Sequence, residues 1–395
     1  MSARRISLCL SGTDLHLLYL DLDGFPYERL QTPDNIWHAR HAVPNPNRTT
    51  FQAVKLVQGA GSLLFVIGLD TAGRLSCIAS DEEGRWAGDF ARLPNQSGIA
   101  FTCFDAVGVG DGGIVVVAVS TGQVAYTQTT LDGVNWSQPG WSNQPTSSYP
   151  YPSDPYGVSE NYEAPFPPTF MAASIGSSQP WEDGLGAPVI AGLAPGPHEN
   201  FPVVLCTDEN GDWQWGDVPS ISETTYHRGT GKQITIKSLP YQAIIRDLYF
   251  GPILLLLGAD GNIYCNIPTD DLLWDWTHHG EALPNPNGLF FTKAVVAAGY
   301  PNSPDHAEKL QVIAVSKQDQ LPYLIWHDGT DAHFGRSAWN WAGPLPMPFP
   351  AKKVTDFDVA GGATALVVAY LATDGTFFTN SQDQQGAWDV YGPLN

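Results

Sequence analysis

The chain has 395 residues, of which 43% are hydrophobic and 11% aromatic, so it can bury a substantial core and does not have the composition of a disordered protein. Its formal net charge of -21 argues against binding to nucleic-acid phosphates or to an anionic membrane surface. The 40 glycines and 32 prolines indicate frequent turns and argue against long helices.

The N-terminal region contains short apolar segments, ISLCLS, LHLLYLDLDG, PYERLQ and IWHARHAVP, which we interpret as four short strands. It has neither an uninterrupted apolar segment nor a small-residue cleavage site, so we predict no signal peptide and expect a cytoplasmic protein. The five cysteines are scattered and show no CxxC spacing, which is typical of reduced, buried thiols.

The next segment shows the pattern most clearly. Apolar runs at 51–57, 62–70, 74–80 and 85–93 are separated by glycine-containing turns, which predicts four antiparallel strands joined by hairpins. The phrase SDEEGRW, at 80–86, falls between the third and the fourth strand, where Ser and Asp accept hydrogen bonds from turn amides and Gly supplies a positive φ.

Variants of this phrase recur along the chain, as TLDGVNW, TDENGDW, TDDLLW and SQDQQGAW. The tryptophans that end these phrases, with three more at matching places, are separated by 49 to 77 residues. Repeats of about 40–50 residues built from short strands predict a propeller. We therefore predict an all-β fold, a seven-bladed β-propeller of four-stranded antiparallel blades, with one tryptophan packed between each pair of adjacent blades. These tryptophans are Trp37, Trp86, Trp136, Trp213, Trp274, Trp339 and Trp388.

The repeat divides the whole chain, 1–395, into one domain with two long insertions, 142–167 and 219–240. Both insertions link a fourth strand to the next first strand, so we expect them on one face of the disc, beside the enlarged turn 194–200. The predicted blades span residues 4–47, 50–96, 100–141, 168–218, 241–286, 289–347 and 352–395.

These enlarged loops are rich in aromatic, carboxylate and imidazole side chains, and three interpretations stay open. Tyr and His beside carboxylates can transfer protons, as in a cofactor-independent lyase, isomerase or cyclase acting on a sugar or a biosynthetic intermediate. Tyr and Arg can instead stack on and hydrogen-bond a sugar, or the loops can simply pack on the disc. The catalytic candidates are Tyr162, His198, Glu199, Tyr226 and His227, and the ligand-binding candidates are Tyr149, Tyr151 and Arg228.

The first strands should line a central channel, and they carry polar residues. Such residues are expected around water, although mixed charges at one mouth could also bind a small molecule, with Arg246 as our candidate. No metal-binding or nucleotide-binding motif is present, so we predict neither a metal nor a cofactor. The polar residues of the first strands are Gln52, Lys55, Asp105, Arg246, Asp247, Lys293, Asp356 and Asp358.

The stretches GLDTAGRLSCIASDEEGRW, GADGNIYCNIPTDDLLWDW and LATDGTFFTNSQDQQGAW resemble tectonin-like propellers and the bacterial seven-bladed fucose-binding lectins. The resemblance implies sugar pockets between neighbouring blades, lined by aromatic and polar side chains. It makes Trp215, Trp276 and Trp341, each two residues after a repeat tryptophan, the candidates for stacking on a sugar. The repeats have diverged, which favours a single specialised site over many equal ones. Carbohydrate or small-ligand binding is thus our first prediction, with an enzyme or a protein-interaction platform as alternatives, and the oligomeric state is left open.

Overall fold

The computed structural model describes residues 4–11, 13–34, 36–59, 63–86, 88–94, 98–109, 113–137, 142–143, 172–178, 187–195, 200–207, 213–216, 236–238, 244–247, 251–266, 281–297, 311–327, 341–348, 352–361, 366–382 and 387–394. All of the regular structure in these ranges is β-strand, in agreement with the predicted all-β class. Within these ranges no helix has the length and apolar character needed to cross a membrane.

The described strands pair into seven antiparallel sheets, numbered here along the chain, and each sheet is one continuous segment of it. Sheet 1 comprises β1 (Ile6–Ser11), β2 (Asp14–Leu20), β3 (Pro26–Gln31) and β4 (His41–Ala42). Sheet 2 comprises β5 (Phe51–Gln58), β6 (Leu64–Asp70), β7 (Leu75–Ala79) and β8 (Ala91–Arg92). Sheet 3 comprises β9 (Phe101–Gly108), β10 (Ile114–Ser120), β11 (Ala125–Thr130) and β12 (Ser142–Asn143).

Sheets 4, 6 and 7 follow the same order of strands, and sheet 5 has one additional strand. Sheet 4 comprises β13 (Ala172–Ser178), β14 (Ala187–Pro195), β15 (Asn200–Thr207) and β16 (Trp213–Gly216). Sheet 5 comprises β17 (Ile236–Ser238), β18 (Ile244–Asp247), β19 (Gly251–Gly258), β20 (Ile263–Asn266) and β21 (Glu281–Ala282). Sheet 6 comprises β22 (Phe291–Ala297), β23 (Gln311–Ser316), β24 (Pro322–His327) and β25 (Trp341–Pro346). Sheet 7 comprises β26 (Val354–Gly361), β27 (Leu366–Ala372), β28 (Phe377–Gln382) and β29 (Trp388–Leu394).

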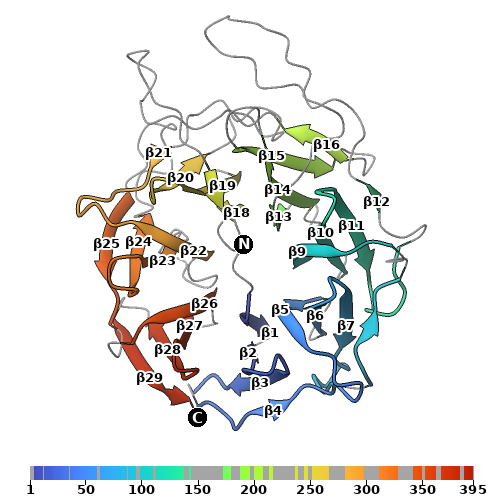
Figure 1. Ribbon diagram of the computed structural model, residues 1–395. Coiled ribbons are helices and arrows are strands. Elements are labelled where there is room, and N and C mark those ends of the chain that lie inside the picture. Colours follow the sequence, from blue (N-terminus) through green and yellow to red (C-terminus); the bar gives the residue numbers. More distant parts are fainter. Residues whose placement is uncertain are drawn as a thin grey trace, which may run out of the picture.

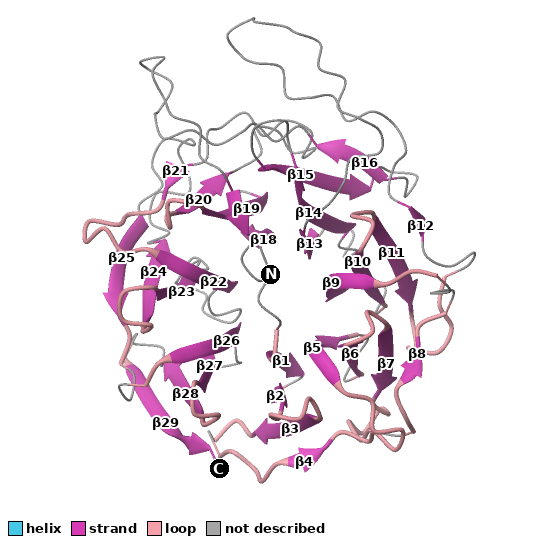
Figure 2. Cartoon of the chain, in the orientation of Figure 1, coloured by secondary structure: helices cyan, strands magenta, loops and turns pink. Residues whose placement is uncertain are grey.

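The sheets stand side by side around a common centre, with β1, β5, β9, β13, β18, β22 and β26 nearest the middle (Figure 1). Neighbouring inner strands touch one another from β1 through β5, β9 and β13 to β18, β19 of sheet 5 touches β22, and β22 touches β26. The last inner strand, β26 of sheet 7, touches β1 of sheet 1. Six of the described sheets are simple four-stranded up-and-down arrangements, whereas sheet 5 has five strands, with β17 and β18 both paired to β19. All the described regular elements are strands (Figure 2).

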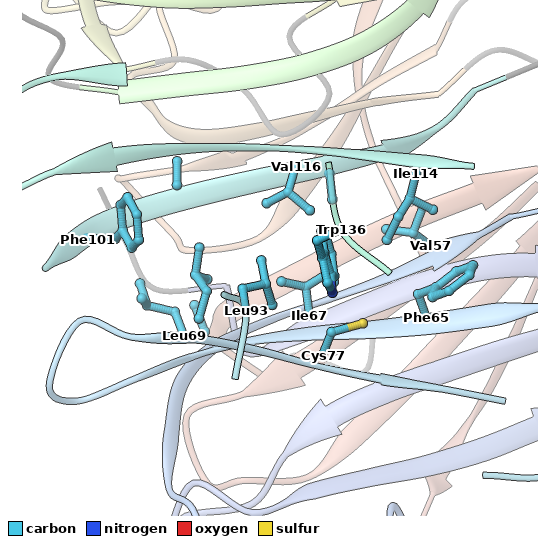
Figure 3. Packing of buried hydrophobic residues seen from close by; sticks show 14 residues of the cluster. Val57, Phe65, Ile67, Leu69, Cys77, Leu93, Phe101, Ile114, Val116 and Trp136 are labelled. Atoms are coloured by element: carbon cyan, nitrogen blue, oxygen red, sulfur yellow. The ribbon is translucent and has the colours of Figure 1, made fainter. Parts of the chain in front are cut away.

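Apolar side chains fill the space between adjacent sheets. Figure 3 shows the cluster between sheets 2 and 3, where Phe65, Ile67 and Leu69 of β6 face Val116 of β10 and the indole of Trp136 lies among them. Strands that pack on both faces read as continuous apolar runs, as β6 and β10 do.

The repeat tryptophans lie between sheets as predicted, wherever their side chains are described. Trp136 is only 8% exposed and packs between its own sheet 3 and the preceding sheet 2. Trp86 packs between sheets 2 and 1, Trp388 between sheets 7 and 6, and Trp37 between sheets 1 and 7. Each of these indoles therefore packs between its own sheet and the sheet that precedes it around the common centre.

The hairpin before the tryptophan also has the predicted chemistry. In the third repeat, the carboxylate of Asp132 accepts the backbone N–H groups of Val134 (2.8 Å) and Asn135 (2.6 Å), and these bonds hold the pKa of Asp132 down to about 2. Gly133 has a φ of 73°, and a Cβ there would lie 2.9 Å from the ring of Phe65, so only glycine fits this turn.

Sheet 6 corrects one part of the repeat alignment. In sheets 1, 2, 3, 4 and 7 a residue at the end of the third strand pairs with the repeat tryptophan, as Thr130 does with Trp136 and Gln382 with Trp388. In sheet 6 the equivalent residue, His327, pairs with Trp341. Trp341 packs against the cluster between sheets 5 and 6, so it occupies the position that we had assigned to Trp339. The long insertion before β25 shifted the sequence alignment by two residues.

Two short strands extend into the segments assigned to insertions. Ser142–Asn143 forms β12, the outer strand of sheet 3, and Ile236–Ser238 forms β17, which pairs with β19. The fourth strand of sheet 2 is shorter than expected, because Trp86 forms an isolated bridge with Ser80 and regular pairing resumes only at β8.

Charged side chains from the inner strands form ion pairs close to the centre of the molecule. Asp105 of β9 contacts the guanidinium of Arg4 at 3.1 Å and the ammonium of Lys55 on β5 at 3.3 Å, and all three are buried. Lys293 of β22 pairs with Asp356 of β26. Lys55, Asp105, Lys293 and Asp356, which we predicted to line a wet channel, form ion pairs that join different sheets at their inner edges. Arg4, which we had not singled out, joins them.

The contact between sheets 7 and 1 joins the two ends of the chain without any shared strand. Apolar residues of β1 and β2 pack against β27 and Phe377. Two buried carboxylates of β26 add hydrogen bonds: Asp356 accepts the N–H of Arg5 at 2.6 Å, and Asp358 accepts that of Leu8 at 2.9 Å. We call this contact the terminal seam.

Replacement of Trp136 by alanine should remove the largest side chain between sheets 2 and 3. The expected loss is about 3–5 kcal/mol of unfolding free energy, the usual cost of truncating a buried aromatic residue. Urea unfolding followed by fluorescence or circular dichroism measures it. Val134→Ala, in the same hairpin at a site that is 76% exposed, is the matched control and should change stability by less than about 0.5 kcal/mol.

Asp105→Asn should leave the buried cations Arg4 and Lys55 without their shared counter-charge. Breaking a buried ion pair from one side costs about 3–5 kcal/mol. The same substitution at Asp389, on an exposed position of β29, is the control. Equal urea midpoints for the two variants would show that the central ion pairs do not stabilise the ring of sheets.

Candidate functional site

Most of the residues singled out in the loops lie outside the described part of the chain. This holds for Tyr149, Tyr151, Tyr162, His198, Glu199, Tyr226, His227, Arg228 and Trp276. The backbone of Trp215 lies in β16 opposite Leu205, and that of Arg246 lies in β18 opposite Pro252. Of these candidates, Trp341 is the one whose side chain is described, and it is half-buried between sheets 5 and 6.

A polar group that the sequence analysis did not single out lies between sheets 1 and 2. Its centre is the carboxylate of Glu28 on β3, whose side chain is 3% exposed. One oxygen contacts Nδ1 of His16 at 2.5 Å, and the other contacts Nε2 of His41 at 2.7 Å and accepts the indole N–H of Trp86. We call Glu28, His16, His41 and Trp86 the Glu28 cluster.

Strand pairing brings these residues together. Glu28 pairs directly with Leu18 of β2 and with His41 of β4, and His16 is two residues before Leu18 on the same face. Leu18 belongs to the apolar cluster between sheets 1 and 2, so this face is turned toward sheet 2. Trp86, the repeat tryptophan of sheet 2, completes the group from the opposite side.

The cluster holds its carboxylate ionised. Burial alone would raise the pKa of Glu28, but the hydrogen bonds from His16, His41 and Trp86 outweigh it and lower the pKa to about 2. The bond to Glu28 raises the pKa of His41 above its ordinary value. The side chain of His41 is 52% exposed, which makes it the most exposed of the three partners of the carboxylate.

Sheet 1 is the one sheet with an acidic residue at this place of its third strand. The residue is three positions before the partner of the repeat tryptophan, as Glu28 is to Gln31. In sheet 5, where Trp274 lies outside the described residues, the place follows from the pairing of Cys265 with Glu281, which matches that of Glu28 with His41. The equivalent residues in sheets 2 to 7 are Cys77, Thr127, Val204, Cys265, Leu324 and Thr379.

A sequence signal for the cluster existed but was weak. PYERLQ places an acidic residue inside a strand of an otherwise apolar repeat, and WHARH supplies two imidazoles shortly after it. Burial of an acidic residue implies a partner. Nothing in the sequence shows, however, that the partners are an imidazole of the neighbouring strand and an indole 58 residues away. Among the described residues, no group of three or more His, Cys, Asp or Glu side chains is arranged to hold a metal ion.

Comparison with solved structures places the fold among lectin β-propellers. The BP39L lectin from Burkholderia pseudomallei matches with a TM-score of 0.64 at 14% identity, covering 100% of this chain and 99% of that chain. AofleA from Arthrobotrys oligospora matches with a TM-score of 0.50 at 11% identity, covering 98% and 86%. A lectin from Aleuria aurantia, described as a six-bladed β-propeller with a novel fucose recognition mode, gives a TM-score of 0.45 at 13% identity, covering 99% and 96%.

No protein-family model and no curated protein matches the sequence. At these identities the structural similarity shows the fold alone: an all-β propeller of four-stranded antiparallel sheets, of the kind found in lectins. The predicted resemblance to lectin propellers is confirmed at that level.

The Glu28 cluster predicts a pH dependence of stability. The pKa of His41 is raised in the folded protein, so its bond to Glu28 stabilises the fold below a pH of about 6.5 and this contribution is lost as the pH rises through the raised pKa. The pKa of Glu28 is lowered to about 2, so its contribution is complete above about pH 4.5 and is lost on acidification toward pH 2.

The difference in unfolding free energy between the wild type and His41→Gln should therefore be largest between about pH 5 and 6. It should stay below about 1 kcal/mol, because His41 is half exposed, and should shrink toward pH 8. Urea titrations across this range measure it. His38→Gln, at an exposed site in the same segment, is the control, and a pH-independent difference for His41→Gln would contradict the prediction.

Proposed function

We propose that this protein is a lectin-like, seven-bladed β-propeller that binds carbohydrate through one site centred on the Glu28 cluster. The observation that carries the proposal is a buried, ionised carboxylate between two blades, surrounded by imidazole and indole groups, in a fold shared with the BP39L lectin.

The number of blades is part of this proposal. Seven separate sheets, each made from one continuous segment, support it, as does the contact between β26 and β1. The tryptophans between sheets support it further, since Trp37 joins sheet 1 to sheet 7 in the same way that Trp86 joins sheet 2 to sheet 1.

The chemistry of the cluster suits a hydroxylated ligand. A carboxylate accepts hydrogen bonds from sugar hydroxyls, imidazole can both donate and accept, and the indole N–H donates. The indole of Trp86 combines an apolar face with a polar N–H edge, and it is half-buried, so part of its ring is accessible from solvent. A hydroxyl that enters beside the half-exposed His41 can replace the imidazole as donor to Glu28 without leaving the buried charge unpaired.

Divergence of the repeats supports a single site. Thiol, hydroxyl and aliphatic side chains replace the carboxylate at the equivalent places of the other sheets, so those places lack the ionised acceptor. The chain therefore has one site of this kind, and sites of this kind do not cross-link glycans within one chain. The stacking role predicted for Trp215 and Trp276 stays a prediction, as does the enzymatic alternative for the loop residues.

The test is a glycan array followed by calorimetric titration of the best ligand. We expect one Glu28-dependent ligand per chain, and Glu28→Gln should weaken its binding at least about tenfold, because it removes the ionised acceptor worth roughly 1.4 kcal/mol or more. Glu83→Gln, on an exposed turn of sheet 2, is the matched control and should bind as the wild type does.

Two results would overturn the proposal. One is the absence of binding to any glycan of the array. The other is equal affinity of the Glu28→Gln variant and the wild type, which would place the ligand elsewhere on the propeller.

A further inference from the structure

We propose that a cavity at the terminal seam is a second binding site, which takes a neutral polyhydroxylated ligand of mono- or disaccharide size and thereby ties the two ends of the chain together. The proposal rests on the cavity itself and not on the function assigned to the Glu28 cluster. The cavity has a volume of about 630 Å³, which lies in the range of small-molecule sites.

Sheets 1 and 7 contribute opposite walls of this cavity. Sheet 1 supplies Arg5, Tyr19, the turn 21–23 and Arg40, and sheet 7 supplies Thr355 and the segment 371–377. The rings of Tyr19 and Phe377, which are buried, meet across the seam with their centroids 4.2 Å apart. A ligand in the cavity would therefore contact both sheets at once.

The charges that line the cavity balance. Two of the acidic residues that line the cavity already have partners that do not line it. Asp356 pairs with Lys293, and Asp374 with the ammonium of Lys352 at 2.7 Å. That leaves the carboxylates of Asp21 and Asp23 and the guanidinium groups of Arg5 and Arg40, two negative charges against two positive ones. With balanced charges the lining gives neither an anion nor a cation a net attraction that would offset the cost of removing it from water, so a neutral ligand is favoured.

The same side chains select for hydroxyl groups. Asp23 and Arg40 are exposed at the rim, where a carboxylate accepts hydrogen bonds and a guanidinium donates them. A hydroxyl is both a donor and an acceptor, so a polyol can satisfy both residues.

The rim also offers apolar contact. Leu22 is 84% exposed and lies across from Gly375, where a Cβ atom would be 4.0 Å from Cδ2 of Leu22. An exposed leucine at the mouth of a polar cavity suits the C–H face of a sugar ring.

Binding at this place should have an effect that binding elsewhere does not. Sheets 7 and 1 share no strand, so a ligand that bridges them adds contacts to a seam otherwise held by side chains and by the hydrogen bonds of Asp356 and Asp358. A ligand that binds only the folded state also raises the melting temperature as its concentration rises.

The experiment uses the full chain carrying Glu28→Gln, so that the first proposed site does not contribute. The probes are glucose, galactose, fucose, maltose and lactose, with glucuronic acid and glucosamine as charged comparisons. Binding is followed by saturation-transfer NMR, and the seam is followed by hydrogen exchange of β1 and β27. We expect saturable binding of at least one neutral probe, a raised melting temperature and slower exchange in both strands.

Arg40→Gln in this background should weaken that binding at least tenfold. Arg92→Gln, at an exposed position in β8 of sheet 2, is the matched control and should leave it unchanged. Leu22→Asp, at an exposed position, tests the apolar contact without disturbing the core and should also weaken binding.

The proposal is overturned if no neutral probe binds, if a charged probe binds better, or if Arg40→Gln binds as the control does. Loss of array binding by Glu28→Gln alone bears only on the first site.

Discussion

Side-chain packing between sheets is the constraint on which the molecule depends. Backbone hydrogen bonds satisfy each sheet internally, and no described sheet takes a strand from another. Cohesion of the ring therefore comes from apolar clusters between neighbours, each with an indole at its edge wherever the repeat tryptophan is described, and from ion pairs near the centre. A flat, rigid indole suits this place, because it covers a large area and loses little conformational entropy on burial.

The tryptophan spacing was enough to predict the sheet order and the packing of the interblade indoles. A sequence repeat identifies the residues that recur in every unit, here the turn, the tryptophan and the apolar strands. It cannot identify a functional residue that occurs in one unit alone. Glu28 is of that kind: its partners His41 and Trp86 are defined by strand register and by contact between sheets, which the sequence does not state. Trp341 shows the related failure, where an insertion moved the alignment by two residues.

The acidity of the chain has a structural origin as well as an effect on solubility. Aspartates at the start of turns accept backbone N–H groups, as Asp70, Asp81 and Asp132 do, and each unit can reuse this device. Other aspartates, among them Asp105 and Asp356, are buried near the centre beside cations. The negative charge is thus partly a product of repetition, and it does not by itself indicate a cationic partner.

The terminal seam contains the same kinds of interaction as the contacts between the other neighbouring sheets, apolar side chains and an indole. Each of the two sheets that meet there is formed by one continuous segment of the chain. Addition or deletion of the gene segment that encodes one whole sheet would therefore leave every remaining strand paired and would break no backbone hydrogen bond in the other sheets. The remaining sheets would only have to change their mutual angle slightly to meet again. The number of sheets can thus change without any change in the hydrogen bonding within a sheet.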